Sequence, residues 1–160
     1  MRKQSILMAL SFAGLTTTTL SAVAQSVYTG EGHLLLTPSE LVWKDAPAVA
    51  PGAKIAVIEG PLDKAVPFTF RLALPANAKI APHVHPAFER VTVLSGTFYF
   101  ARGDTYEPSK TQALGQGSVA VMPPGTPMFG YTKEATVIQL HGVGPWGIKY
   151  PNQADDPRQK

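Results

Sequence analysis

The stretch from Pro82 to Gly96, which reads PHVHPAFERVTVLSG, carries the pattern that decides the fold. Two histidines, His83 and His85, stand two residues apart, and Glu89 follows four residues after the second. In an extended chain, residues two apart point to the same face. The three side chains share their parity with the apolar positions of the run that follows, so they are predicted to face one interior. Two imidazoles and one carboxylate form a ligand set that suits a divalent metal.

Composition limits the classes of protein to which this chain can belong. The 160 residues are 44% hydrophobic and 16% charged, which suits one packed globular domain better than a disordered chain. The chain has no cysteine, so thiolate metal sites and cysteine nucleophiles are excluded. Lys and Arg exceed Asp and Glu by only 14 to 11 and form no basic cluster. We therefore expect no nucleic-acid binding.

The first 24 residues have the pattern of a secretory signal peptide. Arg2 and Lys3 give it a positive start, residues 6–15 form a short apolar run, and Ala24 ends an A-x-A cleavage site. We expect cleavage between Ala24 and Gln25, a periplasmic or secreted mature protein, and no stable membrane insertion after cleavage. An uncleaved membrane anchor is the alternative, but the apolar run is short and interrupted by Ser and Thr, so it would not easily span a bilayer.

Turn residues divide the rest of the chain into short β-rich runs. Glycine (14) and proline (15) together exceed their usual share. Strands are predicted at residues 54–59, 68–74, 89–94, 97–101, 118–122, 128–131 and 135–141. Apolar and polar residues alternate clearly in 68–74, and the two runs that flank Ser95 and Gly96 are predicted to pair as a hairpin. The pattern indicates an all-β fold, a single β-barrel or jelly roll.

One short helix is expected before these strands. Thr37 can cap it, Pro38 suits the first helical position, and Glu40 stands three residues after the cap. Residues 41–43 would form its buried side, and Pro47 prevents a long extension. We therefore divide the mature chain into an N-terminal arm with this helix (25–51), the barrel (52–150) and a polar C-terminal tail (151–160).

Two motifs, in this order, resemble the signature of the cupin superfamily across residues 52–150. The motifs are His83-x-His85-x3-Glu89-x6-Gly96 and Gly117-x5-Pro123-x-Gly125. The resemblance implies a small single-domain cupin, a jelly-roll barrel and a metal held by the first motif. Two mild departures are Asn77, where a glycine is expected, and Thr132, where an asparagine is expected. Asparagine tolerates the left-handed backbone that such a turn requires.

Met128 stands where the resemblance implies a fourth ligand, a histidine. A thioether is a soft ligand that suits Cu(I) better than Fe, Mn, Ni or Zn. Three interpretations remain open. His83, His85 and Glu89 form a 2-His-1-carboxylate triad with open positions; Met128 completes a copper-tolerant site; or the metal site is lost, and the pocket binds without metal. The triad ranks first and loss of the metal close behind it. The copper site ranks third, because the hard carboxylate of Glu89 is a poor ligand for Cu(I).

Other side chains are candidates for the surroundings of the metal. If the polar face of residues 135–141 lines the interior, Gln139 or His141 could act beside the metal ligands, and the alternative for His141 is a hydrogen-bonded structural role. Tyr99 and Phe88 are candidate pocket residues together with Met128. The alternative for Tyr99 and Phe88 is that they only pack in the core. Trp146 could stack on a ligand or fill one end of the barrel.

The resemblance implies a range of functions rather than one. We expect an exported, metal-binding cupin that acts as an oxygenase, isomerase or hydrolase on a small oxygen-rich or aromatic molecule. The divalent metal would be Fe, Mn, Ni, Zn or Cu. The alternative is a non-catalytic, small-molecule-binding cupin with a degenerate metal site, so whether the chain is an enzyme stays open. A homodimer is expected, since small cupins often associate through sheet edges.

Overall fold

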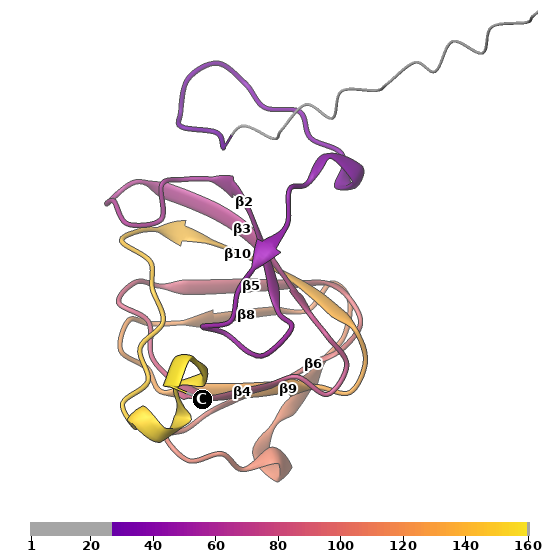
Figure 1. The fold of residues 1–160 in the computed structure, drawn as a ribbon, viewed down its shortest axis with the longest axis vertical. Helices are drawn as coiled ribbons and strands as arrows, with labels where there is room; N and C mark the ends of the chain where they lie inside the picture. The colour runs from indigo at the N-terminus through magenta and orange to yellow at the C-terminus, as the bar shows by residue number, and fades with distance from the viewer. Residues whose placement is uncertain (1–26, 160) are drawn as a thin grey trace, which may run out of the picture.

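The computed structural model describes residues 27–159 (Figure 1), and the predicted signal peptide with its cleavage site lies outside these residues. The strands are β1 (Lys44–Asp45), β2 (Lys54–Glu59), β3 (Pro67–Leu74), β4 (Lys79–His83), β5 (Glu89–Ser95), β6 (Phe98–Arg102), β7 (Gln112–Leu114), β8 (Val119–Met122), β9 (Met128–Thr132) and β10 (Thr136–Val143). Four short 3₁₀ turns are η1 (Pro38–Glu40), η2 (Pro108–Lys110), η3 (Gln153–Asp155) and η4 (Pro157–Gln159). Within the described range, no helix is long and apolar enough to cross a membrane.

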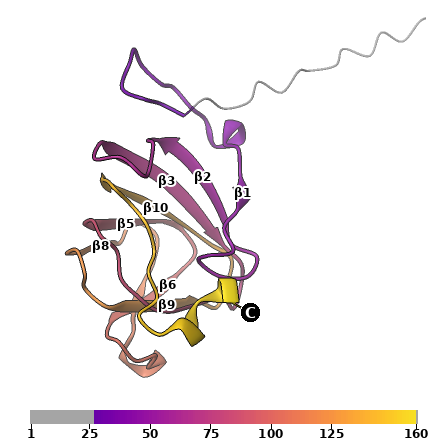
Figure 2. The ribbon, with the colours of Figure 1, turned by 60° about the vertical axis from the view of Figure 1, so that its left-hand side comes forward.

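The strands form two antiparallel sheets that face each other (Figures 1 and 2). The larger sheet has the order β1-β2-β3-β10-β5-β8, and the smaller sheet has the order β4-β9-β6-β7. The last strand, β10, lies between β3 and β5, so the chain returns to the middle of the larger sheet. This architecture confirms the predicted all-β jelly roll.

Alternating side chains build the core between the sheets. Phe68, Phe70, Leu72 and Leu74 on β3 are buried, and the residues between them are half-buried. Leu140 on β10 faces Phe70 in the antiparallel register. Every predicted strand overlaps a strand of the structure. Three short strands were not predicted, namely β1, β4 and β7.

The predicted hairpin across Ser95 and Gly96 is wrong. β5 pairs with β8 and β10 in the larger sheet, whereas β6 pairs with β7 and β9 in the smaller one. The turn therefore carries the chain from one sheet to the other. Gly96 has a φ of 72°, and a Cβ there would lie 2.6 Å from the carbonyl oxygen of Ala135 and 2.6 Å from Oγ1 of Thr136. A glycine allows this corner to pack against the turn before β10.

The predicted N-terminal helix is not confirmed. The segment forms only the single 3₁₀ turn η1, in which the backbone N–H of Thr37 donates to Oε2 of Glu40 at 2.7 Å. No residue of η1 is buried, and Val42 is 40% exposed. Because these residues bury little apolar area, packing does not extend the turn into a longer helix.

Replacing the corner glycine should destabilise the protein. We expect Gly96→Ala to lower the free energy of unfolding by about 2–4 kcal/mol, because it adds a left-handed residue and a steric overlap. Gly115→Ala is the matched control, since a Cβ at Gly115 would meet nothing within 4 Å. Urea denaturation measures both variants. Equal stabilities of the two variants would contradict the tight corner.

Candidate metal-binding site

The three motif side chains come from both sheets and lie inside the barrel. His83 ends β4 of the smaller sheet, His85 follows two residues later, and Glu89 begins β5 of the larger sheet. Their exposed fractions are only 5%, 3% and 6%. Met128 begins β9, faces His83 in the register of the smaller sheet, and is completely buried. The fold thus buries all four residues that the sequence pattern singled out, and the register sets His83 opposite Met128.

Backbone carbonyls fix the orientation of both imidazoles. Nδ1 of His83 lies 2.7 Å from the carbonyl oxygen of Ala81, and Nδ1 of His85 lies 2.7 Å from that of Gly147. A carbonyl oxygen only accepts hydrogen bonds, so Nδ1 carries the proton in each neutral ring. This tautomer leaves the Nε2 lone pair of both histidines free to bind a ligand.

His85 and Glu89 each have one buried polar atom without a hydrogen-bond partner in the described protein. Nε2 of His85 lies 3.6 Å from Oε1 of Glu89. Nε2 of His85 and Oε2 of Glu89 are both buried and have no hydrogen-bond partner. The His83 ring lies edge-on to the His85 ring, with centroids 4.8 Å apart and an interplanar angle of 76°.

Burial shifts the protonation of all three groups towards their neutral forms. It raises the pKa of the Glu89 carboxyl to about 8. Desolvation lowers the pKa of His83 to about 4, although the hydrogen bond to Ala81 opposes this shift. Desolvation and then the neighbouring His83 lower the pKa of His85 to about 3. Near pH 7 the site therefore holds two neutral imidazoles and a protonated carboxyl.

The donor set fits a divalent cation in its chemistry. An unpartnered buried polar atom costs about 1–3 kcal/mol, and one cation would satisfy both Nε2 of His85 and the Glu89 carboxylate. Nitrogen and oxygen donors suit Fe, Mn, Ni, Zn or Cu(II). However, in residues 27–159 no three His, Cys, Asp or Glu side chains are grouped closely enough to hold one ion. His85 and Glu89 lie next to each other, but His83 does not complete a three-ligand group with them in this structure.

Trp146 covers one face of the His85 ring. Its ring stacks on the His85 ring with centroids 4.0 Å apart and an interplanar angle of 18°. It also contacts Phe68 and Phe70 at 5.3 Å and 5.4 Å. The sequence left open whether Trp146 fills the barrel or stacks on a ligand, and the structure places it, partly buried, against the core and a motif histidine. The sequence did not predict that the Gly147 carbonyl pairs with Nδ1 of His85. The glycine-rich run after β10 was the only sign of an unusual backbone there.

Gln139 and His141 lie on the outer face of the larger sheet. They alternate along β10 with Ile138 and Leu140, which belong to the core. Oε1 of Gln139 accepts a hydrogen bond of 3.1 Å from Nε of Arg71. A role for Gln139 or His141 beside the metal ligands required that they face the interior. They face outwards, so this requirement is not met.

The two aromatic candidates also lie away from the buried site. Tyr99 alternates with the core residues of β6 and stacks on Tyr131 with centroids 4.6 Å apart. Phe88 is 44% exposed, and the guanidinium of Arg90 lies 5.2 Å from its ring centroid. Of the three expected pocket residues, the structure brings only Met128 to the histidines.

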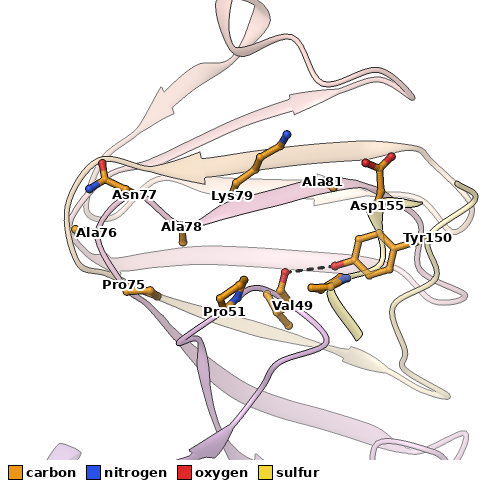
Figure 3. Close-up of a pocket in the computed structure, with 11 residues that line it drawn as sticks. Val49, Pro51, Pro75, Ala76, Asn77, Ala78, Lys79, Ala81, Tyr150 and Asp155 are labelled. Carbon is orange, nitrogen blue, oxygen red and sulfur yellow. Dashed lines mark hydrogen bonds between the residues drawn. The ribbon is translucent and has the colours of Figure 1, made fainter. Parts of the chain in front are cut away.

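Two cavities lie near the histidines without opening on the His85–Glu89 pair. The larger, of about 310 Å³, lies along β4, and Figure 3 shows the side chains that line it. At its end the Tyr150 hydroxyl donates to the carbonyl oxygens of Ala48 and Val49 at 2.8 Å and 3.3 Å, and the Tyr150 ring lies 5.9 Å from the His83 ring. A smaller cavity of about 70 Å³ touches His83 itself.

Solved structures of other proteins share this fold. A polyketide cyclase from Streptomyces resistomycificus has 15% identity and a TM-score of 0.66, and the match covers 80% of this chain and 92% of that one. KdgF from Halomonas sp. has 20% identity and a TM-score of 0.55, with 71% and 96% covered. A salicylate 1,2-dioxygenase from Pseudoaminobacter salicylatoxidans has 15% identity and a TM-score of 0.53, with 66% and 30% covered.

Sequence comparison identifies the family. No curated protein matches this chain. The sequence model described as "Cupin" matches residues 60–142 of the 160, which is more than half of the chain. This range runs from the residue after β2 to the last but one residue of β10 and contains the motif histidines, Glu89 and Met128. The chain belongs to the cupin family.

Proposed function

We propose that this cupin binds one divalent metal ion through His83, His85 and Glu89 and acts on a small oxygen-rich or aromatic molecule. The observation that carries the proposal is the pair of buried, unpartnered atoms, Nε2 of His85 and Oε2 of Glu89. A protein that leaves such atoms unsatisfied in its core has a reason to keep them there.

The residues of the chain have separate parts in this proposal. The two histidines supply neutral nitrogen donors, and the backbone carbonyls at their Nδ1 atoms hold the rings in orientation. Glu89 supplies a carboxylate after it gives up its proton. A bound metal would provide a Lewis acid that polarises an oxygen of the substrate.

Enzymatic activity is supported by the names of similar folds. One is a polyketide cyclase, and another is a salicylate 1,2-dioxygenase whose structure contains adducts with gentisate. Both names are those of enzymes that act on small oxygen-rich or aromatic molecules. We further propose export to the periplasm or beyond and assembly as a homodimer.

A second candidate is a cupin that binds a small molecule without metal. It is favoured by Met128, a completely buried thioether at the position of the expected fourth ligand. It is also favoured by the lack of a preformed three-ligand group in the described part of the chain. This candidate predicts that ligands stabilise the protein in the presence of a chelator.

Metal reconstitution tests the first proposal directly. We expect about one ion per chain after exposure to Fe, Mn, Ni, Cu or Zn, measured by elemental analysis. The bound ion should stabilise the fold by about 2.7 kcal/mol at a hundredfold excess over Kd. His85→Ala should abolish binding, whereas the outward-facing His141→Ala should retain it. Metal at trace levels in the parent protein would end the proposal.

Metal affinity should depend on pH through Glu89 alone. With its pKa raised to about 8, the carboxyl is protonated in the metal-free protein below that pH and must release its proton on binding. The imidazoles, with their pKa values lowered to about 4 and about 3, are already neutral and release none. Affinity should therefore rise about tenfold per pH unit from roughly pH 5 to 7.5 and level off above pH 8.

Calorimetry in buffers of different ionisation enthalpy counts these protons. At a pH well below the Glu89 pKa of about 8, we expect one proton released per ion in the parent protein and none in Glu89→Gln, which should also bind more weakly. Release of two or more protons would mean that a histidine is charged in the metal-free site.

A histidine at position 128 should restore the fourth ligand. We expect Met128→His to tighten divalent metal binding by about 10-fold or more, because one added imidazole donor is worth at least about 1.4 kcal/mol. Met128→Leu is the isosteric control and should leave the affinity unchanged. An unchanged affinity in Met128→His, measured by competition with a chelator, would show that position 128 does not reach the ion.

A further inference from the structure

We infer that the segment Gly144–Tyr150 is the positioning element of the histidine pair and that Trp146 fixes the ring of His85. This inference rests on the proposed metal site and assigns it a residue outside the ligand motif. The segment follows β10 and runs from the larger sheet to the smaller one, as the yellow chain in Figures 1 and 2 shows. We call it the strap.

Backbone hydrogen bonds fasten the strap at both ends. At its start, the N–H of Gly144 donates to the carbonyl oxygen of Val66 at 2.9 Å, and that of Trp146 donates to Leu62 at 2.6 Å. At its end, Val84 and Lys149 exchange two hydrogen bonds of 2.9 Å and 3.0 Å. Val84 stands between the two motif histidines, so the strap is attached to the same short stretch of chain that it would position.

Two contacts from the strap hold the His85 ring. The Gly147 carbonyl accepts the hydrogen bond from Nδ1 at 2.7 Å, and the Trp146 ring covers one face of the imidazole. Trp146 is held in turn by Phe68 and Phe70 of β3. The imidazole can therefore neither flip nor swing without displacing a packed indole, and its Nε2 stays directed at Glu89.

A fixed donor should bind a metal more tightly than a mobile one. An imidazole that is already oriented loses less conformational freedom on coordination. Removal of the groups that orient a metal-binding histidine commonly weakens affinity by about 10–100-fold. Trp146 thus acts through His85 and is a positioning residue.

The stack also supplies an optical test. The chain contains two tryptophans, and Trp43→Phe leaves Trp146 alone. Addition of Cu²⁺ or Ni²⁺ to this full-length mature variant should quench most of the emission, because a paramagnetic ion on Nε2 would lie one ring away from the indole. In Trp146→Phe, which retains only Trp43, the emission should change little over the same titration.

Affinity measurements separate positioning from simple core packing. We expect Trp146→Leu to weaken Ni²⁺ binding by about 10–100-fold and Trp146→Phe, which keeps a stacking ring, to weaken it less. Leu74→Ala is the matched core control, since Leu74 is buried at the opposite end of β3 from Phe68. It should lower the melting temperature and leave Kd unchanged. A Kd in Trp146→Leu equal to that of the parent would overturn the inference.

A second variant tests the strap without touching its ring. A Cβ at Gly144 would collide with the carbonyl oxygen of Lys64, so Gly144→Ala should displace the strap and weaken Ni²⁺ binding as well. Gly115→Ala, outside the strap, is its control, because a Cβ at Gly115 would meet nothing within 4 Å, and its affinity should match the parent. Equal affinities in the two variants would count against the strap.

The metal-free protein separates failure of the inference from failure of the proposed function. The Hε1 proton of His85 should be shifted upfield in NMR spectra by the Trp146 ring current, and Trp146→Leu should remove this shift. If the parent binds no metal but shows the shift, the metal proposal fails and the positioning of His85 stands. If the parent binds metal without the shift, the positioning of His85 by Trp146 is overturned.

Discussion

A carboxyl group and two imidazoles are buried between apolar sheets, and this is the constraint that the rest of the structure has to satisfy. Two of their atoms, on His85 and Glu89, have no hydrogen-bond partner, and each such atom costs about 1–3 kcal/mol. Folded domains are stable by only about 5–15 kcal/mol, so even one such atom left without a partner would take a sizeable fraction of the total. The cost is compatible with folding because apolar side chains from both sheets form one continuous core, whose burial offsets it.

The jelly roll brings these groups together through its connections as much as through its strands. His83 lies on the smaller sheet and Glu89 on the larger one, and only five residues lie between them in the sequence. The corner at Gly96 then returns the chain to the smaller sheet. The strap, whose Gly147 lies 62 residues after His85 in the sequence, completes the surroundings of His85. It places an indole and a backbone carbonyl against the imidazole. Local motif and distant strap meet only in the folded chain.

The sequence predicted those parts of the molecule that local patterns determine. The alternation in β3 gave its inward face, and the spacing of the histidines and Glu89 gave the buried donors. The hairpin at Ser95-Gly96 was wrong because two apolar runs around a glycine turn look the same whether they pair or join different sheets. Strand parity separated Gln139 and His141 from their neighbours on β10, but it does not state which face is inside. The role of the Gly147 carbonyl was beyond reach, since every residue carries such a group.

The division of the donors between the two sheets links their geometry to the internal motions of the domain. Any fluctuation that parts β4 from β5 also moves His83 away from Glu89, so the donors keep their spacing only as long as the barrel stays closed. Proteins open locally over a wide range of free energies. The opening of lowest free energy between the two sheets would therefore set the residence time of a ligand bound in the interior. The rate at which a bound ion leaves such a site would then measure how often the two sheets separate, rather than the strength of any single bond to the ion.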